Sequence, residues 1–206
     1  MPCSLKHEKA LRARGFLSIA GIDEAGRGPL AGPVVAAAAI LPEKFCHEVL
    51  RDSKQLTARQ RERIHEELTG RPEIVWSVAV VEVEEIDRIN ILRASHAAMR
   101  LAVAGLPSPP DHVLIDGLRV DPFPIDQTPL VKGDALSLSV AAASVIAKVT
   151  RDRLMLDYDR EYPAYGFAQH KGYGTALHLE RLRKHGPCPI HRRSFAPVHQ
   201  LLAGSG

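Results

Sequence analysis

Five runs of apolar residues along this chain have the length and flanking residues of β-strands. Residues 16–23 and 34–41 are joined by a turn-rich segment, which predicts a hairpin at the start of a sheet. Residues 74–83 are apolar on both faces, so we expect this strand at the centre of the sheet. Shorter runs at residues 112–116 and 130–131 predict the other two strands.

Four longer stretches show helical spacing of their apolar positions. They cover residues 57–68, 84–106, 139–162 and 175–184. Thr57 and Thr175 are suitable N-cap residues for the first and last of these helices. Small apolar residues surround the first half of helix 139–162, so we expect it to be buried against the sheet. Residues 118–129 and 165–174 are rich in proline or glycine and predict loops.

Acidic residues stand where three of the predicted strands end. Asp23 and Glu24 follow the first run, Asp116 closes the fourth, and Asp134 lies just past the fifth. Carboxylates at neighbouring strand ends converge on one crevice. A solvated acidic turn is the simplest alternative for Asp23 and Glu24 alone, but it does not account for the other two acids.

Four carboxylates can share one crevice only with raised pKa values or with bound cations. Hard oxygen ligands favour Mg²⁺ or Mn²⁺ over zinc. Two such ions about 4 Å apart can stabilise the attacking and leaving oxygens of an in-line phosphoryl displacement. The sequence contains no G-x-S-x-G or similar nucleophile motif. It therefore predicts a metal-dependent site for phosphoryl transfer.

Charge is unevenly distributed over the 206 residues, whose composition is 45% hydrophobic and 25% charged. That composition fits one domain with a full core, and no linker indicates a second. From residue 145 onward there are ten Lys/Arg against five Asp/Glu, so this third carries +5 and the remainder −2. A basic third beside an acidic site is compatible with a polyanionic substrate. Solvated helix faces are the alternative.

Three cysteines, Cys3, Cys46 and Cys188, lie far apart and lack CxxC spacing. This argues against a disulfide framework or a zinc site and favours a reducing compartment. The chain shows no apolar signal core and no run of the roughly 20 residues that a membrane span needs. We expect a cytoplasmic protein with no membrane partner.

Seven segments together resemble the signature motifs of bacterial type 2 ribonuclease H, the ribonuclease HII family. In chain order they read GIDEAGRGPLAGPVV, DSKQL, LIDG, KGD, SVAAASVIAKVTRDRLM, YGFAQHKGYGT and HRRSFAPV. The resemblance runs from about residue 17 to residue 198. Type 3 relatives carry an additional N-terminal domain, and only about eighteen residues precede the first motif here, so type 2 is favoured.

The resemblance implies an α/β RNase H-like fold, with a five-stranded mixed sheet flanked by helices. Residues 1–206 would form one catalytic domain, whose C-terminal helical portion covers about residues 163–206. It also implies an endonuclease that cuts the RNA strand of RNA–DNA hybrids. The family further cuts on the 5′ side of single ribonucleotides in duplex DNA and leaves 3′-hydroxyl and 5′-phosphate ends.

The family's functional residues map onto specific positions of this chain. Its four metal-binding acids fall on Asp23, Glu24, Asp116 and Asp134. Its ribose-sensing Gly-Arg-Gly falls on Gly26, Arg27 and Gly28, and its junction-sensing tyrosine on Tyr173. A 2′-hydroxyl can donate and accept hydrogen bonds, so backbone groups at glycines can recognise it. A simple turn is the alternative for the Gly-Arg-Gly segment.

Several further residues are candidates for contacts with the phosphate backbone. They are Ser53, Lys54, Lys148, His170 and Lys171. Each has a structural alternative: Ser53 can cap a helix, Lys54 can be solvated, and Lys148 can pair with Asp152 four residues on. Arg192 and Arg193 could contact DNA or pack on the core through Phe195.

Two other function classes remain open at this point. A junction resolvase or integrase-like nuclease would share the clustered acids but would not need a 2′-hydroxyl sensor. A non-catalytic hybrid-binding protein would bind the substrate without cleaving it. The expected partner is an RNA–DNA hybrid or a ribonucleotide-containing duplex, and we expect a monomer without an obligate protein partner.

Overall fold

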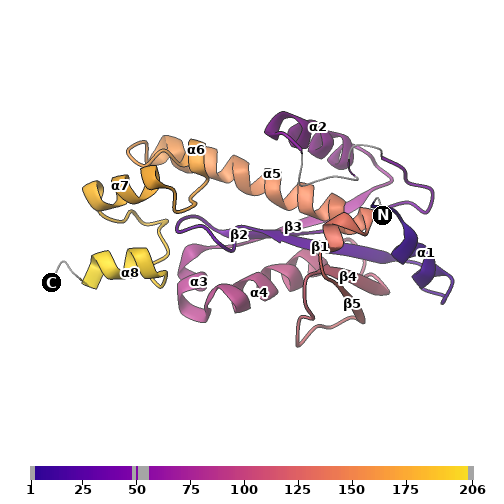
Figure 1. Cartoon of the computed structure of the whole chain (residues 1–206). Helices are drawn as coiled ribbons and strands as arrows, with labels where there is room; N and C mark the ends of the chain where they lie inside the picture. Colours follow the sequence, from indigo (N-terminus) through magenta and orange to yellow (C-terminus); the bar gives the residue numbers. More distant parts are fainter. Residues whose placement is uncertain (1–2, 48–49, 51–55, 204–206) are drawn as a thin grey trace.

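A mixed sheet of five strands lies at the centre of the computed structural model, which describes residues 3–47, 50 and 56–203 (Figure 1). The strands are β1 (Ile19–Ala25), β2 (Val34–Ile40), β3 (Val75–Val81), β4 (His112–Asp116) and β5 (Gln127–Leu130). Their order is β3-β2-β1-β4-β5. The central strand β1 runs antiparallel to β2 and parallel to β4. The predicted hairpin and five-stranded mixed sheet are thus confirmed.

Helices cover both faces of this sheet. The α-helices of the described residues are α1 (Lys6–Arg12), α2 (Ala58–Thr69), α3 (Val83–Ile89), α4 (Ile91–Ala104), α5 (Leu138–Glu161), α6 (Phe167–His170), α7 (Ala176–His185) and α8 (Ala196–Ala203). Helices α2 and α5 lie on one face, and α3 and α4 lie on the other (Figure 1). The C-terminal helices α7 and α8 lie beyond the end of the sheet where β1 turns into β2 (Figure 1).

The second strand is apolar at every position because both of its faces are buried. Alternate side chains of a strand point to opposite faces. Val35 and Ala37 accordingly join the core cluster that includes α5, whereas Val34 and Ala36 join the cluster that includes α4. The small side chains at the centre of β2 allow both helices to pack closely on the sheet.

Gly21 brings the start of α5 against the central strand. A Cβ atom at this position would lie 2.1 Å from the carbonyl carbon of Ser139 and 2.2 Å from the backbone nitrogen of Val140. Only glycine fits such an approach of two backbones. The close packing sets the first half of α5 beside the end of β1, where Asp23 and Glu24 lie.

The expectation that residues 74–83 form a central strand is wrong. β3 is an edge strand, and Val83 already belongs to α3. Trp76 and Val80 are each 37% exposed, because the face that carries them is incompletely covered. An apolar pattern on both faces therefore does not by itself identify a central strand.

The predicted single helix over residues 84–106 is two helices, α3 and α4. Asn90 separates them with a φ of 70°. Asparagine tolerates positive φ better than most residues. Its side chain also accepts a hydrogen bond from the backbone N–H of Arg93 and thereby caps α4.

Boundaries of other elements also differ from the predictions. β1 continues to Ala25 rather than ending at residue 23, and β5 covers residues 127–130 rather than 130–131. Pro129 made residues 127–130 look like a loop in the sequence. A proline is nevertheless tolerated on an edge strand, where the missing backbone N–H would point away from the neighbouring strand. The short helix α6 lies within residues 165–174, where the sequence predicted a loop. Helix α8 lies in the C-terminal portion, about residues 163–206, that the resemblance implies to be helical.

The two predicted N-caps are confirmed. Thr57 caps α2 through a reciprocal capping box with Gln60, and Thr175 caps α7. Cys3, Cys46 and Cys188 are not linked by disulfides. Within the described ranges, no helix is long and apolar enough to cross a membrane.

Candidate active site

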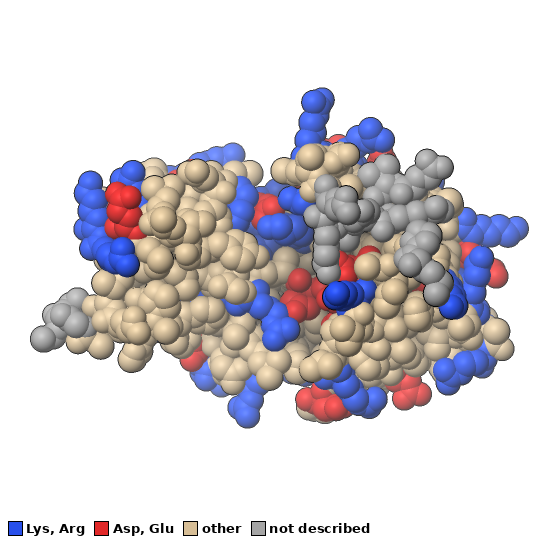
Figure 2. Space-filling model, viewed as in Figure 1, with Lys and Arg blue, Asp and Glu red and all other residues tan. Residues whose placement is uncertain are grey.

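The four predicted acids lie together in one open pocket of about 480 Å³ at the end of the central strands. Figure 2 shows acidic surface in the hollow at the centre of this face, with basic side chains around it. The residues that line the pocket are Asp23, Glu24, Ala25, Gly26, Arg27, Gly28, Arg61, Asp116, Asp134, Ser144, Val145, Lys148 and Tyr173.

Strand pairing explains why acids from distant parts of the sequence meet. Ile22 of β1 lies opposite Ile115 of β4 in a parallel register, so the next residues, Asp23 and Asp116, lie at the same end of adjacent strands. Asp116 then holds the following turn, because its Oδ1 accepts a hydrogen bond from the Gly133 N–H at 2.6 Å. That bond brings Asp134 beside the ends of both strands.

Glu24 reaches the pocket from the penultimate position of β1, where the strand is ending. Asp23 Oδ1 accepts a hydrogen bond from the Glu24 N–H at 2.7 Å. The longer side chain of Glu24 pairs with Arg27 at 3.2 Å in the turn that follows. Because β1 ends one residue later, both acids can line the pocket although they leave the strand in opposite directions.

Burial and mutual repulsion make the ionised acids unfavourable in the protein alone. Burial raises the pKa of Asp23 well above its ordinary value, and the charges of Glu24 and Asp116 raise it further. Burial also raises the pKa of Glu24, although Arg27 opposes this rise. The site thus concentrates negative charge without an equal number of cationic side chains in the pocket.

A divalent cation fits this donor set. Four carboxylates in one pocket are hard oxygen ligands, and a cation would lower their raised pKa values. In the part of the chain that the structure describes, no three His, Cys, Asp or Glu side chains, the pocket acids included, are already arranged as a metal site. The pocket is therefore an open acidic site with the right chemistry for Mg²⁺ or Mn²⁺.

Gly28 and Tyr173 are neighbours in the lining of the pocket. A Cβ atom at Gly28 would lie 3.7 Å from Cε1 of the Tyr173 ring, an ordinary contact distance. The Tyr173 ring is 45% exposed and therefore available to a ligand. The backbone of Tyr173 is held in place, because its carbonyl oxygen lies 2.9 Å from Nδ1 of the buried His178.

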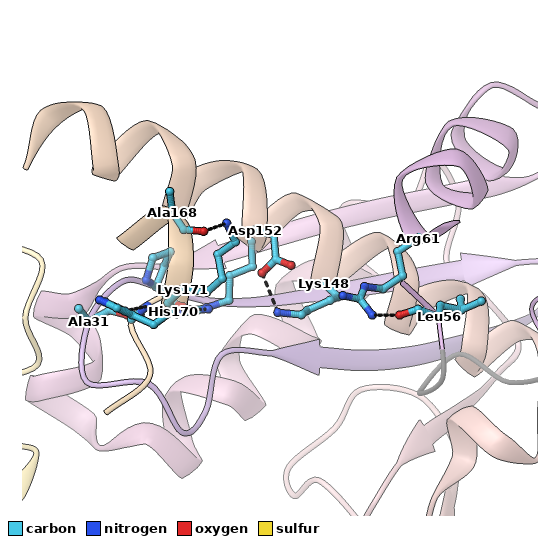
Figure 3. A network of polar contacts seen from close by, with 11 residues as sticks. Ala31, Leu56, Arg61, Lys148, Asp152, Ala168, His170 and Lys171 are labelled. Carbon is cyan, nitrogen blue, oxygen red and sulfur yellow. Dashed lines mark hydrogen bonds and ion pairs between the residues drawn. The ribbon is translucent and has the colours of Figure 1, made fainter. Parts of the chain in front are cut away.

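Lys148 borders the pocket from α5 and forms the anticipated ion pair. Its Nζ lies 2.6 Å from Asp152 Oδ1 (Figure 3). The Lys148 side chain is still 30% exposed. The ion pair and a contact with substrate are therefore compatible, since an ammonium has three donors. Arg61 of α2, which the sequence did not single out, lines the same pocket and donates to the Leu56 carbonyl (Figure 3).

The candidate phosphate contacts divide into three groups. Lys171 lies beside the pocket residues on the loop after α6, and its Nζ donates to the Ala168 carbonyl at 2.6 Å (Figure 3). His170 does not fit a phosphate contact, because its ring is buried and is engaged by the Tyr165 carbonyl and the Gly172 N–H. Ser53 and Lys54 lie outside the described residues.

Sequence reasoning missed Arg151, His178 and His191 as buried polar groups, although it offered core packing as one interpretation of Arg192. Arg151 and Arg192 are fully buried, and His178 and His191 join through their Nε2 atoms at 3.0 Å. Arg192 packs over the Phe195 ring at 5.0 Å, so the core-packing alternative applies to this residue. Arg193 is exposed. No periodic signal marks such residues, because charged side chains are seldom buried without a partner.

Comparison with known proteins identifies the family. A family model described as Ribonuclease HII matches residues 20–198. A ribonuclease HII of Acetivibrio thermocellus is 54% identical over 189 residues, which cover 92% of this chain and 73% of the relative. The crystal structure of ribonuclease H2 from Pyrococcus horikoshii OT3 has a TM-score of 0.74 at 31% identity, covering 91% of this chain and 98% of that one.

Bst-RNase HIII in complex with Mn²⁺ has a TM-score of 0.72 at 22% identity, covering 95% of this chain and 72% of that one, and it shares the fold. The family match spans the acids, the Gly-Arg-Gly turn and the Tyr173 loop. The chain therefore belongs to the ribonuclease HII family, has the RNase H-like fold, and is a hydrolytic ribonuclease H that acts on RNA–DNA hybrids.

Proposed function

We propose that this ribonuclease H cuts on the 5′ side of single ribonucleotides in duplex DNA, as well as in RNA–DNA hybrids. The products would carry 3′-hydroxyl and 5′-phosphate ends, as in ribonucleotide removal during DNA replication and repair. One observation supports the proposal: the Gly26–Arg27–Gly28 turn and the exposed Tyr173 line the same pocket as the four acids. In this proposal residues 1–206 form one catalytic domain, and the protein acts as a monomer.

The metal sites in this proposal are formed by Asp23, Glu24, Asp116 and Asp134. Two ions, Mg²⁺ or Mn²⁺, would supply Lewis-acid stabilisation of the attacking and leaving oxygens. The presence of Mn²⁺ in Bst-RNase HIII supports this choice of ion. The remaining pocket residues bind and orient the substrate. Backbone groups of the Gly-Arg-Gly turn would read the ribose, and Lys148 and Lys171 would hold phosphates.

Cleavage of a duplex with one ribonucleotide, compared with the all-DNA duplex, tests this function. Both are incubated with and without Mg²⁺ or Mn²⁺, and the product ends are identified. We expect a single cut on the 5′ side of the ribonucleotide, only with metal. Equal cleavage of the all-DNA duplex would favour a resolvase or integrase-like nuclease. Binding without cleavage in either metal would favour a hybrid-binding protein.

Asp23→Asn is expected to stabilise the metal-free protein at neutral pH. The pKa of Asp23 is raised in the folded state, so folding favours its protonated form. The stability that this preference contributes is present below the unfolded-state pKa and is lost as pH rises toward the folded-state pKa. Asn cannot ionise, so the melting temperature at pH 7 should rise by about 2–4 °C, the shift for roughly 1 kcal/mol in a chain of this size.

The same melting experiment tests metal binding independently of activity. Mn²⁺ should raise the melting temperature of the wild type and raise that of Asp23→Asn much less. Asp126→Asn removes an exposed carboxylate outside the pocket and should behave like the wild type. An equal Mn²⁺ response in Asp23→Asn and the wild type would remove Asp23 from the metal site.

Binding of the hybrid should weaken with added salt, because phosphate contacts release counterions. Lys148→Ala and Lys171→Ala should each reduce the slope of log K against log [salt] by about one. Lys54→Ala should do the same if Lys54 contacts a phosphate. Lys184→Ala removes an exposed charge outside the pocket and is the matched control. If the slope of a lysine variant equals that of Lys184→Ala, that lysine does not contact a phosphate.

A further inference from the structure

Two fully buried arginines lie beneath the turn that joins β1 to β2. Arg151 comes from the middle of α5, and Arg192 comes from the segment before α8. They are separated from the turn by more than a hundred residues in the sequence. Neither belongs to the acid cluster or lines the pocket.

Arg192 binds both ends of the turn through its guanidinium group. Its Nη2 donates to the Gly26 carbonyl at 2.6 Å, and its Nη1 donates to the Arg27 carbonyl at 3.0 Å. Its Nε donates to the Gly32 carbonyl at 3.0 Å. A planar guanidinium with five donors in a rigid arrangement can hold several carbonyls in one geometry, which a lysine cannot do.

Arg151 connects the same turn to the loop that carries Tyr173. Its Nε donates to the Pro33 carbonyl at 2.9 Å and its Nη2 to the Ala31 carbonyl at 3.0 Å. Its Nη1 donates to the Lys171 carbonyl at 3.0 Å. A direct bond from the Leu30 N–H to the Gly172 carbonyl, at 2.8 Å, reinforces this connection.

The backbone conformation of the turn at Gly26 leaves room for the buried Arg151 side chain. Gly26 has a φ of +100°, and a Cβ atom there would lie 2.1 Å from Arg151 Nε. The conformation therefore requires glycine for its dihedral angle and for the space that the arginine occupies. Removal of the arginine contacts would leave the Gly26 and Arg27 carbonyls without partners in a buried environment.

Within the part of the chain that the structure describes, neither buried guanidinium group donates a hydrogen bond to a carboxylate. Among the described residues, all their recorded hydrogen bonds go to backbone carbonyls. Burial and the neighbouring Arg151 lower the pKa of Arg192 to about 9, so it remains a cation at neutral pH. Burying two charges is costly. A neutral hydrogen-bonded core would be a less costly way to secure a turn, so the charges themselves require an explanation.

We propose that Arg192 is a specificity-determining positioning residue, which holds the Gly26–Arg27–Gly28 backbone in the conformation that recognises the ribose 2′-hydroxyl. Arg151 holds the loop that carries Tyr173 at a fixed distance from this backbone. The inference rests on the proposed function. The Gly26 carbonyl shares a peptide unit with the Arg27 N–H, and the Arg27 carbonyl shares one with the Gly28 N–H. A cation bound at each carbonyl polarises the peptide unit and strengthens its N–H as a donor.

Arg192→Lys tests this role, with Arg183→Lys as the matched control. Arg183 is exposed, lies on α7 outside the pocket, and undergoes the same chemical change. We expect Arg192→Lys to lower kcat/KM on the single-ribonucleotide duplex by about tenfold, equivalent to roughly 1.4 kcal/mol. Its preference for binding that duplex over the all-DNA duplex should shrink. The Mn²⁺-induced rise in melting temperature should stay at the wild-type value, because the acids are unchanged. Arg183→Lys should match the wild type in all three measurements.

The outcomes separate this inference from the proposed function. A wild type that shows no preference between the two duplexes contradicts the proposed function itself. A wild type with that preference, retained in full by Arg192→Lys, contradicts only the role of Arg192. If Arg192→Lys does not fold, Arg151→Lys is measured for the ratio of kcat/KM on the single-ribonucleotide duplex to that on a uniform hybrid, which should fall. An unchanged ratio, or failure of both variants to fold, would assign the arginines to stability alone.

Discussion

Asp134→Asn should reduce cleavage of an RNA–DNA hybrid by about a hundred- to a thousandfold, the order expected when one group that stabilises transition-state charge is lost. Asp134 is 3% exposed and lies in the pocket with the other three acids. Losing one carboxylate from a two-ion site weakens transition-state stabilisation more than substrate binding. Affinity for the hybrid should therefore change little.

The measurements are kcat at saturating Mg²⁺ and the dissociation constant of the hybrid without metal. Asp126→Asn makes the same charge change at an exposed position outside the pocket and should keep wild-type turnover. The melting temperature of each variant shows whether the fold is intact. Wild-type turnover of Asp134→Asn at saturating Mg²⁺ would remove Asp134 from the catalytic site.

Tyr173→Ala is expected to lose most activity on the single-ribonucleotide duplex while keeping its melting temperature and its metal dependence. Stacking on an aromatic ring contributes about 1–3 kcal/mol per base in single-strand binding, which corresponds to roughly a five- to 150-fold loss. A flat ring stacks well on a deoxyribose and poorly where a 2′-hydroxyl intrudes. The position of Tyr173 opposite Gly28 would let the two sites recognise consecutive sugars, first the ribose and then the deoxyribose.

Tyr173→Phe separates stacking from hydrogen bonding and should keep much of the activity. Both variants are compared by kcat/KM on the single-ribonucleotide duplex and on a uniform hybrid. The exposed ring argues against the alternative that Tyr173 serves only to pack on the last helices. Equal losses on both substrates, together with a lower melting temperature, would support that alternative and contradict junction sensing.

The acid cluster was predictable because its signals are local. A strand that ends in an acid can be recognised from a short run of residues, and parallel strands bring their ends together. Asp23 and Asp116 meet for this reason. Asp134 needed one further contact, the bond from the Gly133 N–H to Asp116, which no sequence pattern shows.

Errors occurred where the environment of a segment decided its structure. The pattern of β3 is that of a buried strand, yet its position at the edge follows from pairing that involves distant residues. Asn90 interrupts a continuous helical pattern, because a single residue can adopt a positive φ without altering the spacing of its neighbours. His170 looked accessible in a glycine-rich loop, but packing of the C-terminal segments buries its ring.

By itself the sequence determined the order of most elements, the hairpin that carries Asp23 and Glu24, the metal-compatible chemistry of the four acids, and the family. These properties depend on periodicity, on residue chemistry, and on motifs that are contiguous in the chain. Only the tertiary structure decided which strand is central, where Tyr173 lies relative to Gly28, and why Arg151 and Arg192 are buried. The physical reason is that a buried guanidinium needs several acceptors around it. Here the acceptors are backbone carbonyls, which converge only after distant segments have packed together.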